Sequence, residues 1–179
     1  MMRKTLEVNT LSHLYTIREF LPNMIKINKG HVVSISSLAG TVGLPGLADY
    51  CASKFGAFAI DECLRLEMKK NNYNISTTCI CPYYINTGMF EGVKSSWSMP
   101  ILDQNWVVWR IITAIRQDER VVLMPWNANL YFVGRGIFPT WLGDWIFKVC
   151  GAFNQMDDFK GRTAIAQVKP VIMQQQDQL

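Results

Sequence analysis

The chain has 179 residues, of which 49% are hydrophobic and 18% charged, so it can bury one sizeable core and is not disordered. Its net charge is only +4, and no basic cluster is interleaved with aromatic residues, which argues against a nucleic-acid partner. The five cysteines follow no disulfide or metal spacing, and the two histidines are isolated. We therefore expect reduced thiols, a cytosol-facing protein and no metal site.

Residues 4–28 are predicted to form the first helix, because apolar residues between Leu14 and Met24 recur at steps of three and four. Asn9 stands near the start of this helix, where one interpretation of its role is helix capping. Residues 32–36 are predicted to form a buried strand, since β-branched residues dominate them.

Ser37 follows that strand, at the edge where open α/β sheets place their ligands. Glycines and a proline then predict a loop over 40–46, and a helix is predicted over about 49–71. On this helix Tyr50 and Lys54 lie one turn apart on the same face. An ammonium near a phenol lowers the phenol's pKa, so the pair can exchange a proton with a substrate alcohol or carbonyl, while the serine holds that oxygen.

Ser37, Tyr50 and Lys54 form the pattern Ser-x12-Tyr-x3-Lys, which resembles the active-site signature of the short-chain dehydrogenase/reductases. The flanking residues resemble the branch that includes retinol dehydrogenases and membrane-associated hydroxysteroid dehydrogenases. The resemblance implies that Tyr50 is the acid/base, that Lys54 tunes it and holds the cofactor's ribose, and that Ser37 orients the substrate oxygen. Val8-Asn9-Thr10 resembles the motif whose asparagine holds a water near the lysine, so Asn9 would support the proton relay.

Residues 75–81 alternate and predict a second strand, followed by a segment that resembles the family's nicotinamide contact. The resemblance implies that Pro82, Ile85 and Thr87 bind cofactor together with Tyr50 and Lys54. The family pattern is usually Pro-Gly, whereas this chain has Tyr83 after its proline. The alternative for this segment is an ordinary strand-exit turn.

The resemblance implies that residues 88–104 form the substrate-covering loop, and their large apolar side chains suit a lipid-like alcohol. The alternative is a surface linker with a tucked Trp97. A helix over 105–116 and a last buried strand over 121–124 are predicted next.

Residues 126–153 are rich in aromatics interrupted by scattered charges. The longest uncharged run nearby, 121–134, is 14 residues, whereas a membrane span needs about 20. We therefore predict a helical segment in the membrane interface. The alternative is a helix packed on the protein's own core or on a partner subunit. Residues 154–179 are predicted to be a polar tail.

The predicted fold class is α/β, a partial Rossmann-like, doubly wound parallel sheet over 1–125 with an added C-terminal hydrophobic helical region. It would match the C-terminal half of a family domain. Nothing in the chain matches the glycine-rich phosphate loop of the family. The resemblance thus implies that the first four strands and the pyrophosphate site are missing, that the inner sheet edge is open, and that dinucleotide binds poorly.

The resemblance implies an oxidoreductase that uses NAD or NADP on a lipophilic alcohol or carbonyl, such as all-trans-retinol or retinal. One alternative is a hydroxysteroid dehydrogenase. Another is an inactive truncated member that binds a membrane or a partner. The expected location is the endoplasmic reticulum membrane or the lipid droplet surface, facing the cytosol, and a homodimer is a possible assembly.

Overall fold

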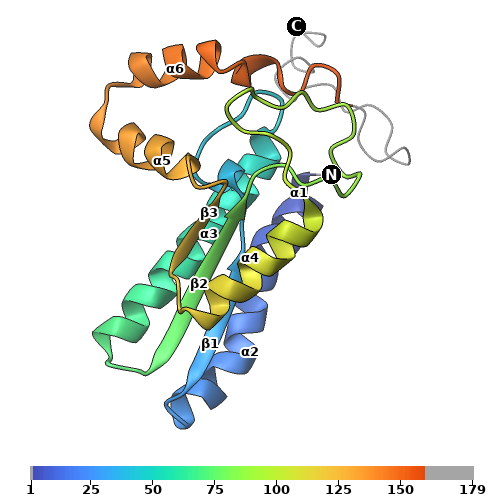
Figure 1. The fold of residues 1–179 in the computed structure, drawn as a ribbon. Helices are drawn as coiled ribbons and strands as arrows, with labels where there is room; N and C mark the ends of the chain where they lie inside the picture. The colour runs from blue at the N-terminus through green and yellow to red at the C-terminus, as the bar shows by residue number, and fades with distance from the viewer. Residues whose placement is uncertain (1, 160–179) are drawn as a thin grey trace, which may run out of the picture.

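The computed structural model describes residues 2–159, and in this part of the chain three parallel strands form one sheet with helices on both faces (Figure 1). The strands lie in the order β1 (Gly30–Ile35), β2 (Ile75–Pro82) and β3 (Val121–Met124). Helix α3 (Ala48–Lys70) connects β1 to β2, and helix α4 (Gln104–Arg116) connects β2 to β3. Parallel neighbours need such crossovers, so all three carboxyl ends meet at one edge of the sheet.

One face of the sheet is covered by α3 and by the N-terminal helical segment. That segment runs as α1 (Met2–Leu6), a π-helical turn η1 (Glu7–Leu11) and α2 (Ser12–Lys26). Leu64 and Met68 of α3 pack with Ile75 of β2, and apolar side chains of α2 complete this cluster. The apolar residues that recur with the helical period in the sequence therefore lie on the side of α2 that packs against this cluster. The π-helical turn η1 was not predicted.

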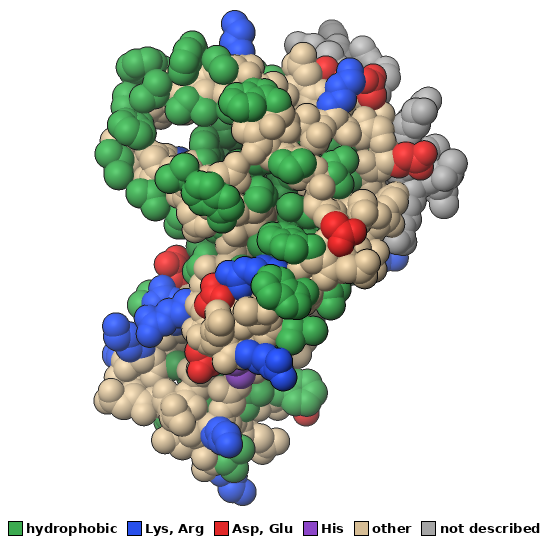
Figure 2. All heavy atoms as spheres, viewed as in Figure 1, with side chains coloured by type: hydrophobic (Ala, Val, Ile, Leu, Met, Phe, Trp, Pro, Cys, Tyr) green, Lys and Arg blue, Asp and Glu red, His purple; other side chains and the backbone are tan. Residues whose placement is uncertain are grey.

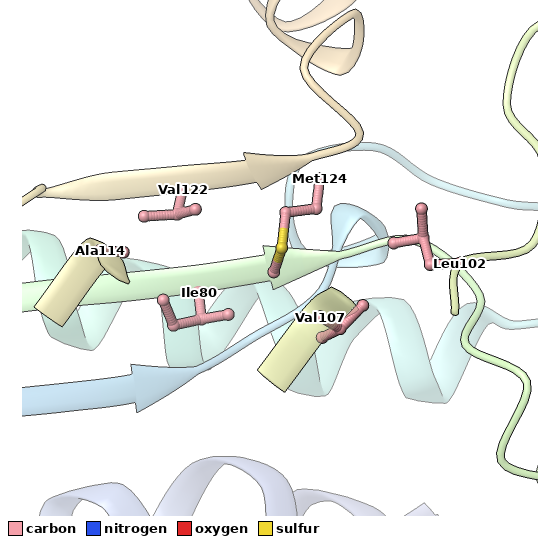
Figure 3. Packing of buried hydrophobic residues seen from close by; sticks show 6 residues of the cluster. All are labelled: Ile80, Leu102, Val107, Ala114, Val122 and Met124. Carbon is pink, nitrogen blue, oxygen red and sulfur yellow. The ribbon is translucent and has the colours of Figure 1, made fainter. Parts of the chain in front are cut away.

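The other face is covered by α4. Figure 3 shows Ile80, Val122 and Met124 of the strands lying close to Val107 and Ala114 of this helix. Cys79, Cys81 and Leu123 alternate with these strand residues along the chain, and they face the α3 side in a second cluster. Strand side chains alternate between faces, so the central strand β2 is buried on both sides, as expected of a parallel sheet.

The prediction of an α/β Rossmann-like fold with a parallel sheet is confirmed, and the predicted strands and helices up to residue 124 differ from the observed ones mainly at their ends. After β3 the chain forms α5 (Ala128–Ile137), α6 (Thr140–Val149) and a short 3-10 turn, η3 (Ala152–Asn154). Of the predicted tail, residues 160–179 lie outside the described residues.

Candidate active site

Ser37 lies directly after β1, at the carboxyl edge of the sheet. Its hydroxyl accepts a hydrogen bond from the Ala39 amide at 3.2 Å and so caps the short helix η2 (Leu38–Gly40). The same hydroxyl donates to the Pro82 carbonyl at the end of β2, at 3.3 Å. Contacts with two elements therefore determine the position of this oxygen.

Tyr50 and Lys54 lie one turn apart near the start of α3, as predicted. Lys54 Nζ is 5.8 Å from the centroid of the Tyr50 ring and donates to the Ile35 carbonyl at 3.1 Å. Ser37, Tyr50 and Lys54 all line one cavity. The structure thus brings the serine, the phenol and the ammonium together at the end of β1.

The turn after Ser37 approaches α3 so closely that residue 40 has to be glycine. A Cβ at Gly40 would lie 2.4 Å from Ser36 Oγ and 2.6 Å from the Lys54 carbonyl oxygen. Ser36 donates to that same carbonyl at 2.9 Å. This glycine therefore permits the contact that positions Lys54, in addition to making the turn.

Burial raises the pKa of Tyr50 above the ordinary value of a phenol, and the Ser37 side chain opposes this shift only in part. Burial also lowers the pKa of Lys54. Our expectation that the ammonium lowers the pKa of the phenol is therefore wrong as the net result for this chain, because desolvation of the phenolate outweighs its partners. Tyr50 keeps its proton at neutral pH, which is the state that can donate to a carbonyl.

Asn9 lies in the π-helical turn η1, within a helical segment that begins at Met2. The capping interpretation is therefore wrong. Its side-chain amide donates to Ser53 Oγ at 3.1 Å, and Ser53 donates in turn to the Tyr50 carbonyl at 2.7 Å. Asn9 is thus linked to the backbone of α3 between Tyr50 and Lys54.

The cofactor residues expected from the sequence, Pro82, Ile85 and Thr87, line the same cavity as Ser37, Tyr50 and Lys54. The segment is ordered by a bridge between residues 85 and 102 and by a hydrogen bond from the Thr87 amide to the Ile85 carbonyl at 2.8 Å. These residues line one space beside the phenol, where the resemblance implies that the nicotinamide ring binds.

That space is a cavity of about 1300 Å³ between the sheet edge, the segment 88–104 and helices α5 and α6. Figure 2 shows hydrophobic side chains gathered around a hollow at the end of the molecule formed by α5 and α6. The apolar lining includes Leu38, Met89, Phe90, Met99, Tyr131, Phe138 and Phe147. Trp97 is 79% exposed, so the alternative of a linker with a tucked tryptophan is wrong.

His13 was treated as isolated in the sequence, yet it lies near the site. Its pKa is lowered by burial and by the positive charge of Lys54. The signal that could have found it is its position four residues after Asn9, on the same helical segment. Within residues 2–159, no group of His, Cys, Asp and Glu side chains could hold a metal ion.

Residues 1–97 match the family model described as short chain dehydrogenase. The chain is 42% identical over 167 residues to epidermal retinol dehydrogenase 2 of Mus musculus, covering 90% of this chain and 53% of that protein. It is 38% identical over 139 residues to estradiol 17-beta-dehydrogenase 11 of Macaca fascicularis, covering 77% of this chain and 46% of that protein. The chain thus spans about half the length of the curated relatives it matches.

A crystal structure of a short chain dehydrogenase from Burkholderia cenocepacia in complex with NADP superposes with a TM-score of 0.69 at 23% identity, covering 82% of this chain and 59% of that chain. A short chain dehydrogenase/reductase from Burkholderia phymatum in complex with NAD gives a TM-score of 0.59 at 18% identity, covering 74% and 57%. At these identities the likeness shows the fold alone. The family model matches more than half of the residues, and the chain therefore belongs to the short-chain dehydrogenase family, in the branch of the retinol dehydrogenases.

Proposed function

We propose that residues 1–125 carry the catalytic half of an NAD(P)-dependent oxidoreductase that acts on a lipophilic alcohol or carbonyl, such as all-trans-retinol or retinal. The observation that carries the proposal is the convergence of Ser37, Tyr50 and Lys54 on one side of a mainly apolar cavity of about 1300 Å³. A cavity with apolar walls and a few polar groups at one point suits a lipophilic molecule with one reacting oxygen.

In this proposal Tyr50 donates its proton to a substrate carbonyl in reduction and removes the proton of an alcohol in oxidation. Ser37 holds the same oxygen, and Lys54 favours the phenolate whenever Tyr50 has lost its proton. Asn9 supports the relay from its place beside Ser53. Pro82, Ile85 and Thr87 would hold the nicotinamide of NAD or NADP, which supplies or accepts the hydride when bound.

A hydroxysteroid dehydrogenase is the alternative within the same chemistry. The name of the relative from Macaca fascicularis, an estradiol dehydrogenase, favours it. Steroids and retinoids share an apolar body, so the apolar lining alone accommodates either.

The test is to titrate the purified 179-residue chain with NADH and NADPH by nucleotide fluorescence, and then to add retinal or estrone at saturating nucleotide. We expect formation of the alcohol only at high nucleotide concentration, because nothing in the chain matches the family's phosphate loop and dinucleotide should bind poorly. Saturable binding at micromolar concentration would show that the expectation of poor binding is wrong. A sugar aldehyde should give no product. A folded chain that binds nucleotide yet reduces neither carbonyl would contradict the proposal.

A second function, as a membrane-binding module, is proposed for residues 126–153. Apolar side chains of α5 and α6 that do not line the cavity are exposed, among them Val133, Ile137, Trp141 and Trp145, by 58–70%. Of the helices in the described part of the chain, none has the length and hydropathy needed to cross a bilayer. Helices with such surfaces bind in the plane of the interface, which supports a location on the endoplasmic reticulum membrane or lipid droplet surface, facing the cytosol.

Flotation with phosphatidylcholine vesicles tests this second function. The wild-type chain should float, and the double variant Trp141→Ser/Trp145→Ser should stay at the bottom of the gradient. Trp97→Ser is the matched control, because Trp97 is 79% exposed but belongs to the segment 88–104. Equal flotation of all three proteins would refute the membrane proposal while leaving the oxidoreductase proposal standing.

A further inference from the structure

A second cavity, here called the small cavity, lies between α2 and β1 and is separate from the large cavity at the sheet edge. Its volume is about 200 Å³, and it is open to solvent. The polar residues Ser12, His13 and Thr16 line it on the helix side, and residues 32–35 line it on the strand side. A water molecule takes up about 30 Å³ in the liquid, so the small cavity has room for several waters beside polar groups.

Ile35 joins the small cavity to the catalytic candidates. Within residues 2–159 it is the one residue that lines both cavities. Its carbonyl oxygen accepts the hydrogen bond from Lys54 Nζ at 3.1 Å. A carbonyl oxygen can accept two hydrogen bonds, so a water that enters from the small cavity can bind the same oxygen beside the ammonium. The end of β1 is thus the place where Lys54 and the small cavity come closest.

His13 is the titratable residue on the helix side of the small cavity, one turn after Asn9. Burial and the positive charge of Lys54 lower the pKa of His13, and no hydrogen bond contributes to this shift. Asp61 of α3 and His31 of β1 interact with each other instead and are not among the groups that act on His13. The imidazole is therefore neutral at pH 7, the form that can accept a proton.

The proposed chemistry releases one proton inside the protein in each oxidation. The C–H bond of the alcohol breaks with its electron pair, which leaves as hydride to the bound nucleotide. The hydroxyl proton goes to Tyr50, which has to lose it before the next turnover. A nucleotide and a lipophilic substrate together exclude water from the large cavity. The proton therefore needs an exit on another side of Lys54.

We propose that His13 is this exit: it takes the proton from Lys54 through water in the small cavity and releases it to solvent. In carbonyl reduction the same path carries a proton inward. The inference rests on the proposed function, because the proton comes from Tyr50. His13 does not line the large cavity. It acts through Lys54, so it is a positioning residue for the proton and not a catalytic residue.

The test measures kcat and KM for oxidation of retinol by the 179-residue chain at high concentrations of NAD and of NADP. His13→Ala should lower kcat by at least about tenfold, which is less than the loss of a direct acid/base, and should leave KM unchanged. His13→Gln, which keeps the size of the side chain but cannot carry the proton, should show the same loss. Leu14→Ala is the matched control, because Leu14 is 46% exposed and does not line the small cavity.

Chemical rescue separates proton transfer from a structural role. Imidazole added to His13→Ala should restore kcat, because the small cavity is open and can admit the ring. Pyrazole has nearly the same size and shape but is much less basic, so it should not restore kcat. If His13 only filled space, the two rings would act alike.

Wild-type kcat in folded His13→Ala or His13→Gln would overturn the inference and leave the proposed function standing. A loss that imidazole does not restore, or that pyrazole restores equally, would overturn it as well. A wild-type chain that oxidises no retinol would overturn the proposed function, and this inference with it.

Discussion

The sheet with its covering helices differs from the region formed by α5 and α6 in how far apolar side chains are buried. Helix α3 buries four apolar residues, Cys51, Ala57, Leu64 and Met68, whereas α6 buries none. The polar groups of the catalytic candidates are paired across elements, as Lys54 is with Ile35 and Asn9 with Ser53. In α5 and α6, apolar side chains face the cavity on one side and solvent on the other.

This difference shows how the molecule separates two tasks. The closely packed sheet edge holds a few reacting groups in fixed positions, as acid–base chemistry requires. The looser wall provides apolar surface for a lipophilic substrate and for a membrane. The two regions are joined by few contacts, including the Arg135 guanidinium, which donates to the Thr41 carbonyl and lies 5.6 Å from the centroid of the Phe55 ring.

The largest expected effect is at the packed edge. Tyr50→Phe removes the acid/base while keeping the ring, so turnover should fall by about 10²–10⁴-fold. Tyr15→Phe, at a position that is 67% exposed on α2, should leave turnover unchanged. Carbonyl reduction at saturating nucleotide and the circular dichroism spectrum are the measurements. Retained activity in the folded Tyr50→Phe protein would refute the assignment of the acid/base.

The same substitution in the two regions should have very different effects on stability. Leu64, which is 4% exposed, lies in the core between α2, α3 and the sheet, whereas Leu130 on α5 is 68% exposed. Leu64→Ala should lower the free energy of unfolding by about 2–5 kcal/mol. Leu130→Ala should change it by less than about 0.5 kcal/mol. Urea unfolding measures both, and similar losses would mean that α5 is packed as tightly as the sheet.

Two glycines of one loop provide a finer comparison at the site itself. Gly40→Ala forces a Cβ against Ser36 and Lys54, whereas a Cβ at Gly43 has no neighbour within 4 Å. Gly40→Ala should cost about 1–3 kcal/mol of stability. It should also impair turnover, because Lys54 moves. Gly43→Ala should be neutral or slightly stabilising in the same unfolding assay, and equal effects would refute the close-approach argument.

The smallest expected effect compares a partly buried ion pair beside the sheet with an exposed ion pair near the cavity. Arg110 and Glu119 form two hydrogen bonds, at 2.8 and 2.7 Å, which lower the pKa of Glu119. Because the folded pKa is depressed, this contribution is present above the ordinary pKa of a glutamate, about 4.3, and is lost as the pH falls through the folded value.

Glu119→Gln should therefore lower stability at pH 7 by about 0.5 kcal/mol. The difference from wild type should shrink as the pH falls below 4. Lys94→Gln breaks the exposed 2.6 Å pair with Asp158, beside the cavity loop, and should have no measurable effect. The measurement is the urea midpoint of each variant and of wild type between pH 7 and below pH 4. A stability difference for Glu119→Gln that persists in acid would contradict the predicted contribution of the ion pair.

Much of the fold followed from local patterns. The strand 121–124 was predicted with its observed bounds, and Ser37, Tyr50 and Lys54 were predicted to meet because a strand end and one helical turn determine their places. The split of 126–153 into two helices at Phe138 and Pro139 was not predicted, nor was the π-helical turn at Asn9. Periodicity over such short segments does not distinguish one long helix from two.

The sequence by itself determined the order of strands and helices, the family, and the three groups that could exchange a proton, because spacing along the chain sets which residues share an edge or a helical face. Only the tertiary structure decided the direction of the Tyr50 pKa shift, the place of His13 and the close approach that requires glycine at residue 40. Burial and hydrogen-bond pairing depend on neighbours that are far apart along the chain. No local pattern of residue types records them.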